Sequence, residues 1–203
     1  MNRVKNNSKV AMLAAMFAMI LTSTAFASTA AELVTQINGY GLGEGKGTAL
    51  SAVASGNTVT VTGNVADAAI QLMLNIDSAV TVVWRATLGT SSPIIWMVNL
   101  DGGGTFNMKS GKISAIAGNA IYNGGTGSVN ISGGTVSATT GNAIYNRSVG
   151  SVNISGGTVS AAKEGFAVYN SGDGKITISK TAKVTPKYDA KRELQSSNYP
   201  GAW

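Results

Sequence analysis

The stretch that decides the fold is a repeat: Ser128–Gly150 reads SVNISGGTVSATTGNAIYNRSVG, and Ser151–Gly174 reads SVNISGGTVSAAKEGFAVYNSGDG. An earlier copy of the same unit, TFNMKSGKISAIAGNAIYNGGTG, occupies Thr105–Gly127, and a fading fourth copy, KITISKTAKVT, occupies Lys175–Thr185. Equivalent asparagines recur at a constant interval: Asn107, Asn130 and Asn153. Equivalent tyrosines recur at the same interval, except that the second interval is one residue longer: Tyr122, Tyr145 and Tyr169. A nearly fixed period indicates units that stack on one another, so that each coil needs what the last coil needed.

Within one unit the side-chain pattern has the period of a β-strand. In SVNIS the apolar residues share one face and the polar residues share the other. The glycine pair that follows permits a sharp corner, because glycine adopts positive φ without strain. Two more short strands, Thr135–Ala138 and Asn142–Asn146, follow with corners of their own. Three strands and three corners in each unit are typical of one coil of a parallel β-helix.

The alternatives to a solenoid are weaker. A propeller blade needs a longer repeat, helical repeats need long segments of period 3.6, and leucine-rich repeats need a leucine pattern that is absent. An antiparallel meander would not require residues that superimpose at a fixed period. Upstream segments show the same alternation: Asn57–Val65, Leu72–Asp77, Ala79–Trp84 and Ile94–Leu100. We therefore predict an all-β, right-handed parallel β-helix of about six coils over residues 48–187.

The two flanks of this region differ from it. Ser28–Asn38 (STAAELVTQIN) predicts a short helix with a capping box between Thr29 and Glu32, which would cover the exposed strand edges of the first coil. A glycine-rich loop completes residues 28–47, and its glycine spacing does not fit a phosphate-binding loop. The charged segment 188–203 is interpreted as a C-terminal tail or cap.

Residues 1–27 have the features of a secretory signal peptide. Basic residues precede the apolar run Val10–Leu21, and the sequence Ala25-Phe26-Ala27 forms a small-residue cleavage site. This apolar run is too short for a membrane anchor, which needs roughly 20 residues. We expect a secreted product, extracellular or at the cell surface, with no transmembrane span in the mature chain.

Composition narrows the chemistry. The 203 residues include no Cys and no His, which excludes disulfides, thiolate chemistry, the Ser-His-Asp arrangement and the commonest zinc ligands. No Lys/Arg cluster interleaved with aromatic residues survives removal of the signal segment, so nucleic acid is not an expected partner. We expect no cofactor and no metal.

Catalysis in such a fold would need two carboxyl groups roughly 5–10 Å apart. The acidic residues after the signal segment are scattered: Glu32, Glu44, Asp67, Asp77, Asp101, Glu164, Asp173, Asp189 and Glu193. The best candidate pairs are Asp67 with Asp77, and Asp77 with Asp101, which are separated by about one repeat length and so could stack on adjacent coils. Asp101, followed by Gly102 and Gly103, is better explained as a turn residue. The sequence therefore favours a non-catalytic protein.

The quoted repeats, with the lead-in VTVTGNV…LNIDSAVTVVWRATL…GGGTFNMKSGKISA, resemble repeats of secreted bacterial surface proteins. The resemblance covers about Thr58 to Val184 and implies the pectate-lyase-like right-handed β-helix class. That class includes polysaccharide lyases, glycosidases, adhesins and non-catalytic carbohydrate-binding modules. A shared fold at this level does not transfer an activity.

The candidate ligand-binding residues are those that recur beside each other in the repeat: Tyr122, Tyr145, Tyr169, Asn123, Asn146 and Asn170. If Ile121 and its equivalents point inward, the tyrosines form an outward column that could stack on sugar rings, with the neighbouring amides donating hydrogen bonds. The alternatives are that both ladders are purely structural, or that the tyrosines are core. Other residues are expected to be structural, with Trp84, Trp96 and Met97 packed within the early coils, and Arg147 and Lys163 as solvated corner charges.

The resulting prediction is an adhesin-like surface solenoid that binds polysaccharide or another surface protein. A lyase or glycosidase of the same fold and a structural spacer in a larger surface protein stay as alternatives. The sequence does not indicate an oligomeric state.

Overall fold

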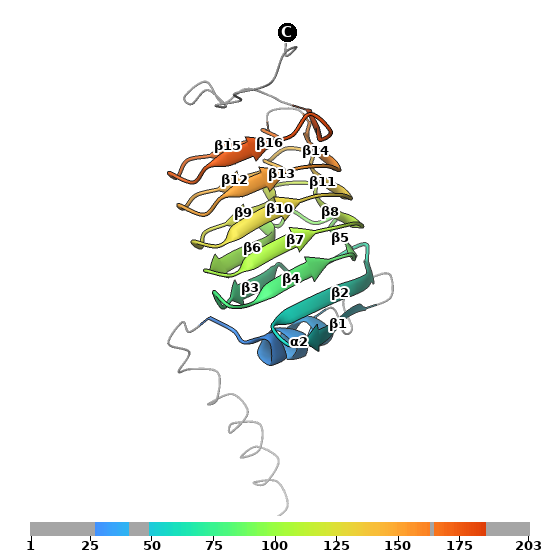
Figure 1. Ribbon diagram of the computed structural model, residues 1–203. Helices are drawn as coiled ribbons and strands as arrows, with labels where there is room; N and C mark the ends of the chain where they lie inside the picture. The colour runs from blue at the N-terminus through green and yellow to red at the C-terminus, as the bar shows by residue number, and fades with distance from the viewer. Residues whose placement is uncertain (1–26, 41–48, 163–164, 186–203) are drawn as a thin grey trace, which may run out of the picture.

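The protein is a parallel β-solenoid of about five turns, and a short helix lies at its lower end (Figure 1). The computed structural model describes residues 27–40, 49–162 and 165–185. The fold predicted from the repeat, mostly strands with a short N-terminal helix, is confirmed. Nearly all of the predicted signal segment, most of the glycine-rich loop and the whole C-terminal segment lie outside the described residues.

Successive turns of the chain contribute strands to three sheets. Sheet A contains β3 (Leu72–Ile76), β6 (Trp96–Gly102), β9 (Asn119–Asn123), β12 (Ile144–Asn146) and β15 (Val168–Asn170). Sheet B contains β2 (Thr58–Val65), β4 (Thr81–Trp84), β7 (Thr105–Met108), β10 (Ser128–Ile131), β13 (Val152–Ile154) and β16 (Ile176–Ile178). Sheet C contains the end of β2, then β5 (Thr87–Gly89), β8 (Lys112–Ala115), β11 (Thr135–Ala138), β14 (Thr158–Ala161) and β17 (Lys183–Thr185).

The register between coils places like residues above one another. In sheet B, Asn130 pairs with Asn107 below it and with Asn153 above it, and all three strands run parallel. In sheet A, Tyr145 pairs in the same way with Tyr122 and Tyr169. The repeat in the sequence is thus a repeat along one axis, as predicted. A corner also behaves as expected, because Gly134 has a φ of 76°, a conformation that favours glycine.

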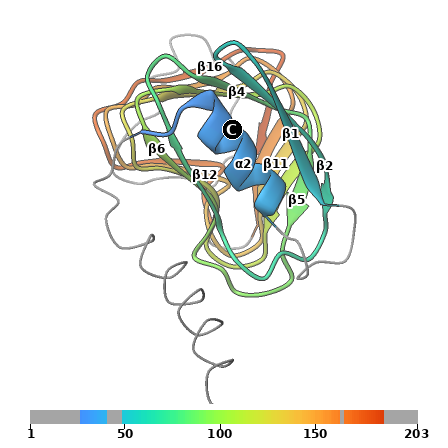
Figure 2. The same ribbon diagram turned by 90° about the horizontal axis from the view of Figure 1, so that it is seen from below.

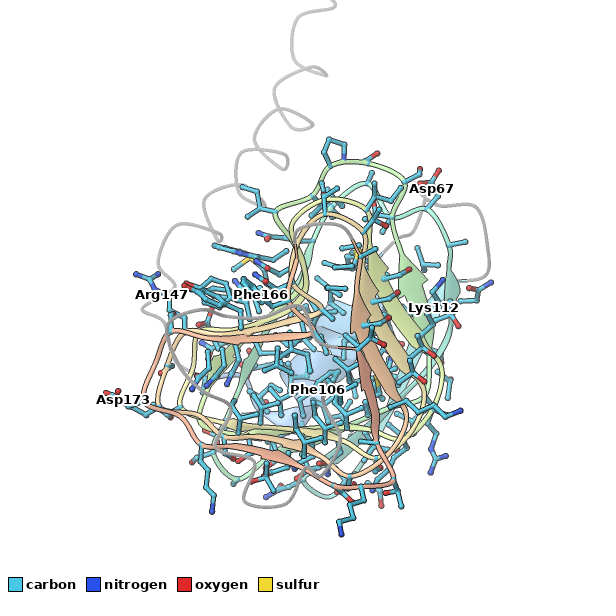
Figure 3. All side chains as sticks on the ribbon, turned by 90° about the horizontal axis from the view of Figure 1, so that it is seen from above. Asp67, Phe106, Lys112, Arg147, Phe166 and Asp173 are labelled. Atoms are coloured by element: carbon cyan, nitrogen blue, oxygen red, sulfur yellow. The ribbon has the colours of Figure 1, made fainter. Side chains whose placement is uncertain are left out.

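The core is built from inward columns of apolar side chains. One column in sheet B runs from one strand to the next and is almost fully buried up to its last member: Val59, Val82, Phe106, Val129, Val152 and Ile176. Phe106 lies in the middle of the molecule when it is viewed along the axis (Figure 3). Trp84 and Met97 are also fully buried, so their predicted place in the core is confirmed.

The lower end of the solenoid is closed by α2 (Ala30–Gly39), which lies across the opening of the coil (Figure 2). Leu33 and Ile37 are fully buried in the core that the strands form. The predicted capping box is present, with the Thr29 side chain accepting a hydrogen bond from the Glu32 backbone and the Glu32 side chain accepting one from Thr29 N–H at 2.8 Å. These bonds to Thr29, the backbone bond first, lower the pKa of Glu32.

The first strand departs from the prediction of parallel coils from residue 48 onward. β1 (Leu50–Ser55) pairs antiparallel with β2, and its last residue faces Thr58, so only Gly56 and Asn57 form the loop. A two-residue loop with positive φ at its first position, here 57° at Gly56, is typical of a tight hairpin. The length of residues 48–187 allows about six coils, but this strand adds no parallel coil and pairs with the lower edge of β2, and the structure has about five turns.

Candidate functional site

The outer face of sheet A carries a column of aromatic side chains. Ile121, Ile144 and Val168 are buried on the inner face, so the tyrosines that follow them point outward. Tyr122 is only 6% exposed, whereas Tyr145 and Tyr169 are half-buried. The sequence predicts an outward column of tyrosines on the condition that Ile121 and its equivalents point inward. The structure meets this condition, so the tyrosines are not part of the solenoid core.

The rings of this column contact one another. The ring centroids of Tyr122 and Tyr145 are 5.4 Å apart with an edge-to-face angle of 83°, and those of Tyr145 and Tyr169 are 5.0 Å apart at 50°. Such tilted pairs place the positive edge of one ring against the negative face of the next. The exposed part of the column consists of the ring areas that these contacts leave uncovered.

Two further aromatic residues extend the column at its ends. Trp96 stacks on Tyr122, with centroids 4.3 Å apart and planes 19° apart, and Phe166 stacks on Tyr169 at 5.5 Å and 21°. We call these five residues the aromatic column: Trp96, Tyr122, Tyr145, Tyr169 and Phe166. The prediction that Trp96 packs within the coils is wrong, because its half-buried ring lies on the outer-face tyrosine of the next coil.

Alignment of the units could have located these two residues. Trp96 pairs with Asn119, and Phe166 takes the place of Asn142 in the repeat, so each stands three positions before an outward residue of sheet A. The interval between equivalent positions is preserved, but the residue type changes from aromatic at the two ends to asparagine in the middle. A search for identical residues at a fixed period therefore missed the equivalence.

The tyrosine hydroxyl groups are held by residues of the coil above. Arg147 Nη1 donates to Tyr122 Oη at 3.3 Å, and Ser171 Oγ donates to Tyr145 Oη at 3.1 Å. The hydrogen bond to Tyr122 raises the pKa of Arg147. Arg147 and Phe166 lie on the same side of the molecule, away from Asp67 and Lys112 (Figure 3). Arg147 is exposed, as predicted for a corner charge, but it also orients a ring.

The space beside Tyr122 is shared with a carboxylate. Leu100, Asn123 and Asn146 pair with one another in sheet A, and the next position of each strand forms an outward column: Asp101, Gly124 and Arg147. A Cβ atom on Gly124 would lie 2.8 Å from Tyr122 Cε1 and 3.0 Å from Asp101 Oδ1, so the ring and the carboxylate both lean over this glycine. The lower part of the face therefore brings together an acid, a cation and two aromatic rings.

The predicted amide ligands have a different environment. Asn123 and Asn146 are 2% and 0% exposed and point into the solenoid at the corner after sheet A. Asn123 Nδ2 donates to Asn146 Oδ1 at 2.7 Å, and Asn146 Nδ2 donates to Asn170 Oδ1 and to Gly150 O, both at 2.9 Å. Asn170 Nδ2 likewise donates within its own coil, to Gly174 O. This arrangement does not support contact between these three amides and a ligand.

The candidate catalytic acids Asp77 and Asp101 do not stack directly on adjacent coils. Asp101 pairs in register with Asn75 rather than with Asp77, so the two acids are offset by two positions. Asp77 Oδ1 accepts a bond from Ala79 N at 2.9 Å, as a turn residue does, and Asp67 accepts bonds from Ser91. Glu164 lies outside the described residues, as do Glu44, Lys163, Asp189 and Glu193.

Within the described ranges, no three side chains of the metal-ligating types gather at one point. In the same part of the chain no helix has the length and apolar character needed to cross a membrane. No protein-family model, no curated protein and no solved structure matches this chain. The likeness to secreted bacterial surface-protein repeats therefore stays a prediction from the sequence, and the geometry of sheet A carries the functional argument.

Proposed function

We propose that this protein is a non-catalytic, exported binding solenoid that holds polysaccharide against the outer face of sheet A. The observation that carries this proposal is the aromatic column, which places aromatic rings on successive coils of one outer face, with Tyr145 and Tyr169 partly exposed. Aromatic side chains provide large, rigid contact areas, and tyrosine adds a hydroxyl group at the wet end of the ring. These are the properties that a flat sugar ring needs from a binding surface.

Repetition strengthens such a surface. Strands of neighbouring coils are ~4.8 Å apart, so one extended chain lying along the axis would meet the same kind of contact at each coil. Individually weak contacts on one rigid array act together, because the first contact raises the local concentration of the others. Arg147 and Ser171 fix the hydroxyl groups of Tyr122 and Tyr145 before a ligand arrives, which lowers the ordering cost of binding.

The enzyme alternative receives less support from the described residues. Asp77 is engaged with its own turn, and Asp67 accepts hydrogen bonds from Ser91 of the next coil. Asp101 has Asn75 rather than an acid as its register partner. The spacer alternative accounts for the inward asparagines, which are structural in either case, and it would need the stacked tyrosines to be structural too. Polysaccharide binding gives a reason for the ring area of Tyr145 and Tyr169 that the stacking leaves uncovered.

A glycan array and co-sedimentation with insoluble polysaccharides would test the proposal on the full chain. We expect binding by the wild type and about tenfold weaker binding by Tyr145→Ala, because one aromatic contact in the middle of the column is lost. Tyr145→Phe keeps the ring and should retain most of the binding.

The matched control is Asn130→Ala, which removes a half-buried outward side chain from sheet B. It should bind like the wild type, and the melting temperature of each variant shows whether it is folded. Equal binding by wild type and a folded Tyr145→Ala variant would overturn the proposal. Calcium-dependent turnover of polygalacturonate would instead favour the lyase alternative.

A further inference from the structure

Asn99 occupies an unusual position at the lower end of the aromatic column. It lies in the middle of β6, in register between Met73 of the coil below and Tyr122 of the coil above. Its neighbours Val98 and Leu100 are buried on the inner face, so Asn99 points outward. It is nevertheless only 5% exposed, which means that side chains on the outer face of the sheet cover it.

The side-chain oxygen of Asn99 has no hydrogen-bond partner among the described residues, although it is buried. The stacked asparagines of the other columns behave differently, because each takes part in a ladder of side-chain bonds at 2.7–2.9 Å: Asn107, Asn119, Asn123, Asn130, Asn142, Asn146, Asn153 and Asn170. A buried acceptor without a donor destabilises a fold, so its presence calls for a reason. A hydroxyl group of a ligand would supply the missing partner.

The surroundings of Asn99 fit one class of ligand. Trp96, three positions earlier on the same strand, stacks on Tyr122 and provides an aromatic surface. Asp101, two positions later, and Arg147 supply one negative and one positive charge beside the same tyrosine, so the place carries no net charge from them. Aromatic area, an amide and a carboxylate acceptor suit a ring that bears several hydroxyl groups and no charge.

We propose that Asn99 is the hydrogen-bonding centre of a subsite for a neutral pyranose ring, flanked by Trp96, Tyr122 and Asp101. This inference rests on the proposed polysaccharide binding and assigns its ligand class and main contact point. A sugar hydroxyl group both donates and accepts hydrogen bonds, so it can pair with the oxygen or with the nitrogen of the Asn99 amide. A ligand would reach the covered amide only if a neighbouring side chain moved, and Met73, which is 48% exposed and directly below Asn99, is the flexible side chain whose movement would open the subsite.

The test is Asn99→Leu in the full chain, with binding to cello-oligosaccharides and chito-oligosaccharides measured by calorimetry or by quenching of tryptophan fluorescence. Leucine has nearly the shape of asparagine but no polar atoms, so the melting temperature should stay the same or rise. Binding of the neutral oligosaccharides should weaken about tenfold, as for the loss of a buried hydrogen bond. A purely structural Asn99 would leave binding unchanged.

Asn123→Leu is the matched control for the amide, because Asn123 is equally buried but bonded within the chain. It should lower the melting temperature and leave the affinity of the folded protein unchanged. A fall in melting temperature for Asn99→Leu would overturn the inference, since it would show that the amide is satisfied within the fold.

The remaining outcomes separate this inference from the proposed function. If Tyr145→Ala weakens binding but Asn99→Leu does not, the subsite is wrong and polysaccharide binding stands. If the wild type binds polygalacturonate and none of the neutral oligosaccharides, the ligand class is wrong and polysaccharide binding stands. If the wild type binds no polysaccharide at all, both proposals are overturned.

Discussion

Two asparagine columns in this protein have almost the same spacing in the sequence and opposite places in the fold. The outer column lies on the solvent side of sheet B and the inner column points into the solenoid after sheet A: Asn107, Asn130 and Asn153, and Asn123, Asn146 and Asn170. Both columns are joined by side-chain bonds between coils. Only the inner column also donates to backbone carbonyl groups of its own corner, such as Gly150 O.

The difference shows that a ladder of asparagines has one role on the outer face of the solenoid and another on the inner face. In the outer column, Asn130 is half-buried, and water can replace a lost bond. In the inner column, Asn146 is fully buried, and its amide donates to the carbonyl groups of Ser148 and Gly150 at the corner. The outer ladder therefore adds to a surface, whereas the inner ladder holds the corner that lets the chain turn into the next coil.

The largest expected effect is that of Asn146→Ala. The substitution removes bonds to Asn123, Asn170 and Gly150 at once and leaves buried polar atoms without partners. We expect the free energy of unfolding to fall by about 2–4 kcal/mol, since each buried group left unpaired costs about 1–3 kcal/mol. Urea denaturation followed by circular dichroism measures this change. Asn130→Ala, the same substitution in the outer column, should cost about 1 kcal/mol or less. Equal losses of unfolding free energy for the two variants would show that the inner and outer columns do not differ in their contribution to stability.

Much of the fold follows from the sequence because its determinants are local and repeated. The strand alternation, the glycine corners and the capping box at Thr29 each depend on a few neighbouring residues, and the structure confirms them. The hairpin between β1 and β2 does not follow from the repeat, because Leu50–Ser55 lies before the first segment that shows the coil alternation. Its direction is set by the short loop at Gly56 and not by the strand residues themselves.

Less of the candidate site than of the fold could be predicted from the sequence. The outward direction of the tyrosines follows from alternation with Ile121, Ile144 and Val168, so that part could be predicted. The inward direction of Asn123 and Asn146 follows from the same alternation, yet it conflicts with a role in ligand contact. The burial of Asn99 could not be predicted, because it depends on how side chains of neighbouring coils pack over the outer face.

A smaller loss of stability is expected from a change at the N-terminus of α2. Unlike the losses expected for the asparagine variants, this loss should depend on pH. Thr29→Ala removes the N-cap of α2 and should lower the free energy of unfolding at neutral pH by about 1 kcal/mol. The bonds to Thr29 lower the pKa of Glu32 below its ordinary value of 4.5. The carboxylate therefore stabilises the folded state above that value, and this part is lost as the pH falls through the folded pKa.

Urea denaturation at several pH values measures this dependence. The difference between wild type and Thr29→Ala should be largest at neutral pH and narrow below about pH 4. The differences between wild type and the asparagine variants should stay constant over the same range, since amides do not titrate. Alanine keeps the backbone N–H that bonds to Glu32, so a gap for Thr29→Ala that is independent of pH would show that the bond from the Thr29 hydroxyl group to Glu32 contributes nothing to the cap.

The smallest change in stability is expected for Asn130→Thr. The same substitution in the inner column, Asn146→Thr, allows a direct comparison of the two columns. Threonine already stands in this outer column at Thr60 and Thr177, near the two ends of the sheet. The variant loses the amide bonds to Asn107 and Asn153, but threonine has the higher strand propensity and water reaches the site. We expect the free energy of unfolding to change by no more than about 0.5 kcal/mol. Asn146→Thr should cost several times more, because the shorter side chain cannot hold the buried corner at Gly150.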